Sequence, residues 1–279
     1  MVTKNMLEAK LADFVNSTPE NTISEAIARS PECVGLTMFK PPILNISDAN
    51  DPIFSELLNP EIIGPHLMTP DVWLPGAKSV ISFMLPYTDR VRTSNKQDFS
   101  WPSTEWMHGR IEGQAMVGAT SEALVSILKQ EGFNAMSPLT DPRLGPKFHF
   151  EDDTAPNPLP RYASRWSERH AAFIAGLGTF GLSRGLITRK GMAGRLGSVI
   201  TDAPFDPDPR EYTDIHEYCT RCGACIKNCP VDAISFEHGK DNTICASFID
   251  KILEAEGGTY YGCGKCQCGV PCETQIPKK

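Results

Sequence analysis

Residues 219–230 read CTRCGACIKNCP, a run of four cysteines that ends in proline. Three cysteines two residues apart let a short loop wrap three corners of an iron–sulfur cube and donate backbone N–H groups to the sulfides. The fourth cysteine, before proline, points away and serves a second cluster. A structural zinc site is the alternative, but zinc sites rarely use three cysteines in such a run followed by Cys-Pro. The run therefore predicts two 4Fe-4S clusters.

Cysteines near the end of the chain complete the two ligand sets. The predicted ligands are, for the first cluster, Cys219, Cys222, Cys225 and Cys272, and, for the second, Cys229, Cys245, Cys263 and Cys266. Cys268 competes with Cys272 for the last position, although Cys266-Gln-Cys268 is a tight spacing for two ligands of one cube. Cys33, far away in the sequence, is expected to be a small buried hydrophobic residue.

Composition indicates a soluble globular protein. The chain has 279 residues, of which 41% are hydrophobic and 22% charged, so it can bury a core without disulfides. Ten cysteines in a reducing compartment favour metal ligands. No stretch reaches the about 18 apolar residues of a membrane helix. Residues 1–15 lack the apolar segment and twin arginine of a secretory signal, so a cytoplasmic protein without membrane contact is expected.

Charge is negative overall but uneven along the chain. The net charge is −7, which does not favour nucleic-acid binding. Seven basic residues and one acidic residue, Glu168, lie between positions 161 and 195. The basic ones are Arg161, Arg165, Arg169, Arg184, Arg189, Lys190 and Arg195. They form either a solvated face or a local anion-binding wall.

Hydrophobic patterning predicts an α+β fold with a small C-terminal module. We expect an N-terminal covering segment at 1–75, an α+β core at 76–210, and a ferredoxin-like domain with two 4Fe-4S clusters at 211–279. Helices are expected at 4–16, 21–30, 114–131 and 164–175, strands at 78–85, 133–136, 186–188 and 198–201, and loops at 87–110 and 137–160. The strands at 186–188 and 198–201 are expected to pair.

Several motifs together resemble the epoxyqueuosine reductase and reductive dehalogenase superfamily. They are the cysteine run, Tyr261–Gln267, Ala171–Gly178 (AAFIAGLG), Gly181, Leu186–Thr188 and Val199–Asp202. The resemblance covers about 75–275 and implies a nitroreductase-like core that holds cobalamin, with two clusters that reduce the cobalt for reductive cleavage. It also implies cofactor contacts at Gly176, Gly178, Gly181 and Thr201. Helix capping and turn formation are the alternative roles of these glycines.

Three departures from the family pattern bear on the substrate. Epoxyqueuosine reductases carry a C-terminal helical repeat that helps to bind tRNA, whereas this sequence stops at Lys279, so a tRNA substrate is not expected. Respiratory dehalogenases carry a twin-arginine signal that is absent here. The last cluster ligand of the family usually falls at the position of Val270, and here Cys272 lies two residues further on.

The resemblance also points to a proton donor before the AGLG motif. Epoxyqueuosine reductases place an aspartate about thirteen residues before the alanine of that motif, and dehalogenases use a tyrosine. Here Tyr162 occupies the position, while Asp153 would need a nine-residue insertion. Arg165 or Arg169 would lower the pKa of such a phenol. The alternative for Tyr162 is a tyrosine packed on the surface, and the alternative for Arg169 is a salt-bridged helix face.

The function expected is an iron–sulfur oxidoreductase. Two clusters would deliver single electrons, from a donor such as ferredoxin or flavodoxin, to a corrinoid or small substrate bound in the core, for reductive cleavage. One alternative is a non-catalytic electron-transfer protein that reduces a partner redox enzyme. Another is an epoxyqueuosine (tRNA) reductase-like enzyme.

Overall fold

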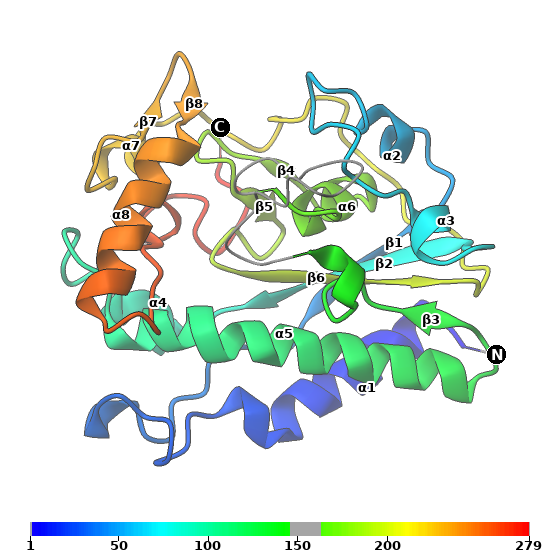
Figure 1. The fold of residues 1–279 in the computed structure, drawn as a ribbon, viewed down its shortest axis with the longest axis horizontal. Coiled ribbons are helices and arrows are strands. Elements are labelled where there is room, and N and C mark those ends of the chain that lie inside the picture. Colours follow the sequence, from blue (N-terminus) through cyan, green and yellow to red (C-terminus); the bar gives the residue numbers. More distant parts are fainter. Residues whose placement is uncertain (1, 146–162, 279) are drawn as a thin grey trace.

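A four-stranded antiparallel sheet forms the centre of the computed structural model, which describes residues 2–145 and 163–278 (Figure 1). Its strand order is β1-β2-β6-β3. Strands β4 and β5 form a second sheet, and β7 and β8 a third. The strands of the three sheets are β1 (Ile43–Asp48), β2 (Ser79–Pro86), β3 (Ala135–Met136), β4 (Gly178–Phe180), β5 (Leu186–Thr188), β6 (Gly194–Thr201), β7 (Ile234–Ser235) and β8 (Gly239–Lys240). The α-helices are α1 (Lys4–Ser17), α2 (Ile53–Glu56), α3 (Pro70–Trp73), α4 (Asp89–Ser94), α5 (Thr104–Gln130), α6 (Glu168–Ile174), α7 (Ala224–Lys227) and α8 (Asn242–Ala255).

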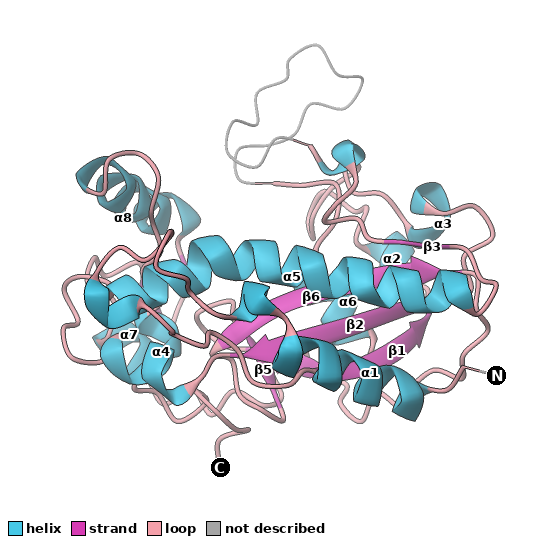
Figure 2. Cartoon of the chain, turned by 90° about the horizontal axis from the view of Figure 1, so that it is seen from below, coloured by secondary structure: helices cyan, strands magenta, loops and turns pink. Residues whose placement is uncertain are grey.

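Strand β2 is buried along its whole length because both faces of the sheet are covered. Successive side chains of a strand point to opposite faces. Ile81 and Phe83 accordingly pack into the core formed with α1 and α5, while Val80 packs with α3 and α6 on the other face. Figure 2 shows α5 and α1 lying across one side of the strands. The α+β architecture predicted from the sequence is confirmed.

The long helix α5 begins and ends with ordinary capping. Ser103 accepts a hydrogen bond from the backbone N–H of Trp106 at 3.1 Å, which satisfies one of the free donors at the helix start. At the other end Gly132 has a φ of 89°, a left-handed conformation that favours glycine. The helix thus starts ten residues before the expected 114, inside the segment 87–110 expected to be a loop. That segment also contains α4.

Two local expectations are wrong. The strand at 186–188 pairs with β4, and the strand at 198–201 belongs to β6, which pairs with β2 and β3. Gly178 permits the first pairing because a Cβ atom there would overlap the backbone of Ile187. Residues 21–30 do not form a helix, since 3-10 turns that begin at Pro19 and Pro31 flank an irregular segment.

The N-terminal segment contributes to the core as well as covering it. Strand β1 is an edge strand of the central sheet, paired with β2 along its whole length. Helix α1 packs Leu7 and Leu11 against the buried face of α5. Among the described residues, no helix combines the length and apolar character that crossing a bilayer requires.

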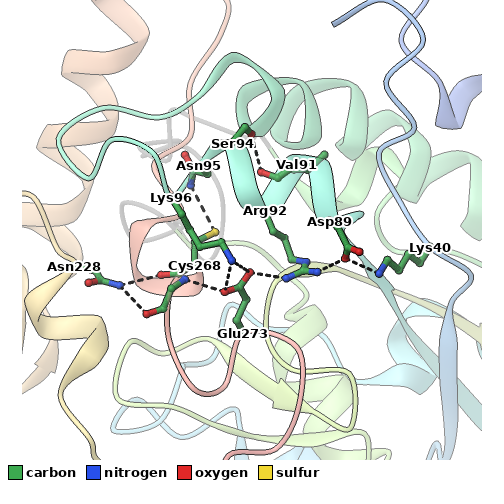
Figure 3. Close-up of polar contacts among 11 residues, drawn as sticks. Lys40, Asp89, Val91, Arg92, Ser94, Asn95, Lys96, Asn228, Cys268 and Glu273 are labelled. Atoms are coloured by element: carbon green, nitrogen blue, oxygen red, sulfur yellow. Dashed lines mark hydrogen bonds and ion pairs between the residues drawn. The ribbon is translucent and has the colours of Figure 1, made fainter. Parts of the chain in front are cut away.

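The C-terminal module packs against α4 and the start of α5 through buried polar contacts. Lys265 is fully buried, and its ammonium donates to both the backbone oxygen and the side-chain oxygen of Asn95 at 2.8 Å. Glu273 pairs with Arg92 at 2.6 Å and with Lys96 at 3.1 Å (Figure 3). These contacts hold the cysteine loops in a defined place beside the core.

Candidate functional site: two cysteine groups and a cavity

One set of cysteines surrounds a small pocket. Cys219, Cys222, Cys225 and Cys272, the first cysteine group, all line it. Burial, with the neighbouring Cys225 and Cys219, raises the pKa of the Cys272 thiol to about 12. Cys222 is exposed, whereas the other three are half-buried. The structure therefore brings together the four residues assigned to the first cluster, and ligation itself stays a prediction.

A further set of cysteines lines a much larger cavity. Cys229, Cys245, Cys263 and Cys266, the second cysteine group, all face it. Burial, with Cys266 and Cys245, raises the pKa of Cys263 to about 12. The backbone N–H of Ala233 donates to the sulfur of Cys229 at 3.3 Å, a bond of the kind that tunes iron–sulfur sites.

The thiols of both groups are suited to bind the iron ions of an iron–sulfur cluster. Burial favours the neutral thiol, and thiolates held close together repel each other, so the thiol pKa values rise. A coordinating metal reverses that preference and deprotonates the thiol. In the described ranges no three His, Cys, Asp or Glu side chains are grouped to hold a single ion, whereas a cube takes one thiolate at each of four irons. Each group offers four thiols, the number of donors that one 4Fe-4S cluster takes.

The remaining two cysteines are fully buried outside both groups. Cys268 lines neither pocket, and the amide of Asn95 donates to its sulfur at 3.8 Å (Figure 3). Burial raises the pKa of Cys268 to about 12. Cys33 packs in the core with α1 and α5, as expected of a small hydrophobic residue. The geometry thus separates Cys268 from Cys272, which the spacing alone left open.

The large cavity, of about 640 Å³, lies between the core and the C-terminal module. Its lining includes Trp106, Arg110 and Gln114 from α5, Glu168 and Arg169 from α6, Arg195 from β6, and the second cysteine group. Apolar side chains of Met84 and Leu186 complete its walls. A molecule held in this cavity would therefore contact both the core and the second cysteine group.

Three arginines in the cavity, Arg110, Arg169 and Arg195, form what we name the arginine cluster. Burial and the neighbouring Arg195 lower the pKa of Arg110 to about 10. Burial and Arg195 also lower the pKa of Arg169, while Cys266 and Cys245 oppose that shift. The side chain of Arg169 is solvent-accessible because it lines the cavity, and the protein atoms of the cavity wall lie around it. The cluster concentrates positive charge next to the second cysteine group.

A buried carboxyl group faces the same space. Burial raises the pKa of Glu168 to about 8 against the lowering effect of hydrogen bonds from Ser198 and Trp166. The hydroxyl of Ser198 donates to Glu168 Oε2 at 2.6 Å, and Trp166 Nε1 donates to that hydroxyl oxygen at 2.9 Å. Glu168 can thus hold a proton near neutral pH, as a general acid must.

The residues expected to be catalytic are only partly placed in this site. Arg169 lines the cavity. Arg165 does not, because its guanidinium donates to the backbone oxygen of Arg143 at 3.3 Å. Tyr162 and Asp153 lie outside the described residues.

The residues expected to contact a cofactor do not line the large cavity. A Cβ atom on Gly176 would lie 2.6 Å from the backbone oxygen of Pro209, and Gly178 faces the neighbouring strand β5. Thr201 is fully buried and donates to the backbone oxygen of Asn134 at 2.8 Å. Gly181 lines the pocket of the first cysteine group. Close backbone packing and strand pairing account for Gly176 and Gly178, and cofactor contact at the four positions stays a prediction.

The basic residues between 161 and 195 do not form one wall. Arg169 and Arg195 face the cavity, while Arg189 pairs with Glu8 at 3.9 Å on an exposed surface. Arg184 is exposed at a turn with a φ of 59°. The expected anion-binding wall is therefore divided, and only two of its described members join the cavity.

Sequence reasoning missed Arg110, Gln114 and Glu168 as site residues. Arg110 and Gln114 lie four positions apart, a spacing that places two side chains on one helix face. That signal was weak because residues 87–110 were expected to be a loop. Glu168 stood out only as the acidic exception among basic neighbours, and its burial depends on packing against β6.

Comparison with known protein families shows that the cysteine module is similar to iron–sulfur domains. The model of the 4Fe-4S binding domain matches residues 212–235. The epoxyqueuosine reductase of Listeria monocytogenes is 33% identical over 106 residues, which cover 35% of this chain and 27% of that protein. The enzyme of the same name from Bacillus anthracis is 31% identical over 114 residues, 38% of this chain and 29% of that protein. The matched part thus spans under a third of these relatives.

Solved structures share the fold over nearly the whole chain. An epoxyqueuosine reductase from Bacillus subtilis has a TM-score of 0.53 at 18% identity, covering 98% of this chain and 67% of that one. A reductive dehalogenase described as B12-dependent has a TM-score of 0.50 at 15% identity, covering 82% of this chain and 29% of that one. In sequence over its matched segment, and in fold over most of its length, the chain resembles the epoxyqueuosine reductase and reductive dehalogenase superfamily, as its motifs predict.

Proposed function

We propose that this chain is an iron–sulfur oxidoreductase that passes single electrons through two 4Fe-4S clusters to a redox group bound in the large cavity. The observation that carries the proposal is that the second cysteine group lines the same cavity as Glu168 and Arg169. The first cysteine group includes the exposed Cys222, where a donor such as ferredoxin or flavodoxin can approach. Electrons would travel from this exposed side to the cavity.

The closeness of the two cysteine groups supports this path. Cys225 belongs to the first group and Cys266 to the second. Burial is the main cause that raises the pKa of Cys225 to about 11, and the nearby Cys266 is the next largest cause. The short helix α7 connects Cys225 to Cys229, so one turn of chain joins both ligand sets. Two clusters held in these positions would be near neighbours.

A corrinoid is the redox group that the fold favours. The cavity offers apolar walls at Met84 and Leu186, against which the ring of a corrinoid could lie. It also offers polar and charged side chains at Gln114, Arg169 and Arg195. These residues fit an apolar ring edged with polar groups. When bound, a corrinoid would supply a metal centre able to reduce and cleave a substrate bond.

Glu168 is the acid that would supply the proton. In the Bacillus subtilis epoxyqueuosine reductase structure, a catalytic aspartate loop is swung out of the active site. The candidates for that role here, Tyr162 and Asp153, lie outside the described residues. Glu168 is in the cavity, and Ser198 holds its carboxyl group by a hydrogen bond of 2.6 Å. When two electrons delivered through the clusters cleave the substrate bond, the anionic fragment would take its proton from Glu168.

Epoxyqueuosine in tRNA is a weaker candidate substrate. The relatives of that name are matched over under a third of their length. The net charge is −7, and the basic residues between 161 and 195 are divided between the cavity and separate surfaces. Nucleic-acid binding depends on a continuous basic footprint. We therefore propose a small-molecule substrate.

Anaerobic purification followed by metal analysis and electron paramagnetic resonance tests the proposal. We expect about eight irons per chain and low-potential signals after reduction. Reconstitution with cobalamin should then give stoichiometric retention of a corrinoid with a changed absorption spectrum. Two reducible clusters without corrinoid retention would instead support an electron-transfer protein that reduces a partner enzyme. A colourless protein with zinc and no iron would refute both.

A further inference from the structure

Within residues 2–145 and 163–278, no acidic side chain forms an ion pair with the arginine cluster. Arg110, Arg169 and Arg195 come from α5, α6 and β6, and all three line the large cavity. None forms an ion pair with an Asp or Glu residue of the described part of the chain, where ten such pairs involve other residues. Holding three cations in one enclosed space costs free energy, because like charges repel most strongly where water is scarce.

The contacts of Arg110 and Arg195 use only part of the donor capacity of each guanidinium group. The guanidinium of Arg110 lies over the ring of Tyr261, 4.5 Å from its centroid. Arg195 donates from Nη2 to the side-chain oxygen of Gln114, while its Nε is buried without a hydrogen-bond partner in the described ranges. Both arginines therefore keep their positive charge and part of their donor capacity for a ligand.

The cysteine sulfurs of the second group act on Arg169 more strongly than on Arg110. Cys266 and Cys245 act electrostatically on Arg169. The charges that act on Arg110 are instead those of Arg195, Tyr261, Tyr87 and Arg169. Glu168 is the one glutamate on α5, α6 or β6 that lines the cavity. Its carboxyl group accepts a hydrogen bond from Ser198 and contacts no arginine of the cluster in this way.

We propose that Arg110 and Arg195 bind an oxyanion, a carboxylate or phosphate group, carried by the substrate of the proposed oxidoreductase, on which this inference rests. Planar guanidinium groups match both oxyanions through paired, charge-assisted hydrogen bonds. Anchored there, the rest of the molecule would lie in the cavity that the second cysteine group also lines. Substrate selection in this cavity then favours small organic acids or phosphate esters over neutral molecules.

Binding of inorganic phosphate to the anaerobically purified holoprotein tests this site. Calorimetry at constant ionic strength should show saturable binding to the wild type. Arg110→Gln and Arg195→Gln should each weaken it at least about tenfold, since each removes a charged donor. Arg189→Gln is the matched control, because Arg189 is exposed outside the cavity and should leave phosphate binding unchanged. Lysine at position 110 or 195 should bind more weakly than arginine but more tightly than glutamine.

The outcomes separate this inference from the proposed function. Iron content and the signals of the reduced clusters test the oxidoreductase and should be the same in all variants. Phosphate binding that is absent, or equal in wild type and both glutamine variants, would overturn the oxyanion site alone. A corrinoid also carries a phosphate, so protein loaded with cobalamin is compared with protein loaded with cobinamide, which lacks the nucleotide. Loss of phosphate binding with cobalamin only would assign the site to the cofactor and overturn a substrate role.

Discussion

The backbone of Gly264 lies directly against the indole ring of Trp106, with no space for a Cβ atom between them. Gly264 also has a φ of 65°, in the left-handed region that favours glycine. Trp106 lies in the first turn of α5 and lines the cavity, and Gly264 falls between Cys263 and Cys266. This contact ties the second cysteine group to the core.

Replacing Gly264 by alanine should therefore release the second cluster. The new methyl group would overlap the Trp106 ring and push the loop with Cys263 and Cys266 away from the core. We expect the iron content to fall toward about four per chain and the melting temperature to drop. Gly258→Ala is the control, because Gly258 has a φ of 77° but nothing within 4 Å of its Cβ position. It should cost about 1–2 kcal/mol of backbone strain and keep its iron. Equal iron loss in both variants would contradict the argument.

Cys272→Ala and Cys268→Ala should differ in cluster content. Cys272 lines the pocket of the first cysteine group, so its loss should remove one cluster and about half of the iron. Cys268 is fully buried and bonded to Asn95, so its alanine variant should keep both clusters with a modest loss of stability. Iron analysis and the spectra of the reduced protein measure the difference. Cluster loss in the Cys268 variant with retention in the Cys272 variant would reverse the assignment.

Glu168 should make stability fall as pH rises. Its folded-state pKa of about 8 lies above the usual 4.5, so between these values the folded chain holds a proton that the unfolded chain has lost. The free energy of unfolding contributed by this group is highest below pH 4.5. It decreases by up to about 1.4 kcal/mol per pH unit until the folded group itself ionises. Glu168→Gln keeps a neutral side chain and should remove this slope in urea unfolding series.

The control for the pH series is Glu61→Gln, since Glu61 is exposed. This variant should keep the wild-type slope. If Glu168 donates the proton, substrate reduction should also decline in the wild type above about pH 8 and be weak at every pH in Glu168→Gln. If Glu168→Gln keeps the wild-type dependence of stability on pH, the pKa of Glu168 in the folded wild type is not raised.

Glu273 should contribute much more to stability than Asp89, although both pair with Arg92 (Figure 3). The side chain of Glu273 is 9% exposed and that of Asp89 is 73% exposed. Glu273→Gln would leave the nearly buried Arg92 without its buried partner, a change that typically costs about 3–5 kcal/mol. Asp89→Asn breaks two exposed pairs, with Lys40 and with Arg92, each worth about 1 kcal/mol or less. Denaturant unfolding of both variants provides the comparison, and equal losses would contradict it.

Local patterns in the sequence predicted much of the fold and the donor set. The buried run at 78–85 is β2, and helix α1 spans nearly the expected residues. The strand pairing at 186–188 was wrong, because pairing depends on which backbones approach closely, and the contact between Gly178 and β5 is not visible in a hydropathy pattern. The helix at 21–30 failed for a similar reason, since flanking prolines and tertiary packing outweigh a short apolar pattern.

The sequence by itself determined the chemistry of the C-terminal module, because ligand spacing is a local property of a short loop. Only the tertiary structure decided which late cysteine joins the first group and which lies buried beside Asn95. It also decided the composition of the cavity. Arg110, Glu168 and Arg195 are far apart along the chain and meet because α5 and α6 pack on opposite faces of one sheet beside the module. Such convergence depends on packing between distant segments, which residue spacing does not encode.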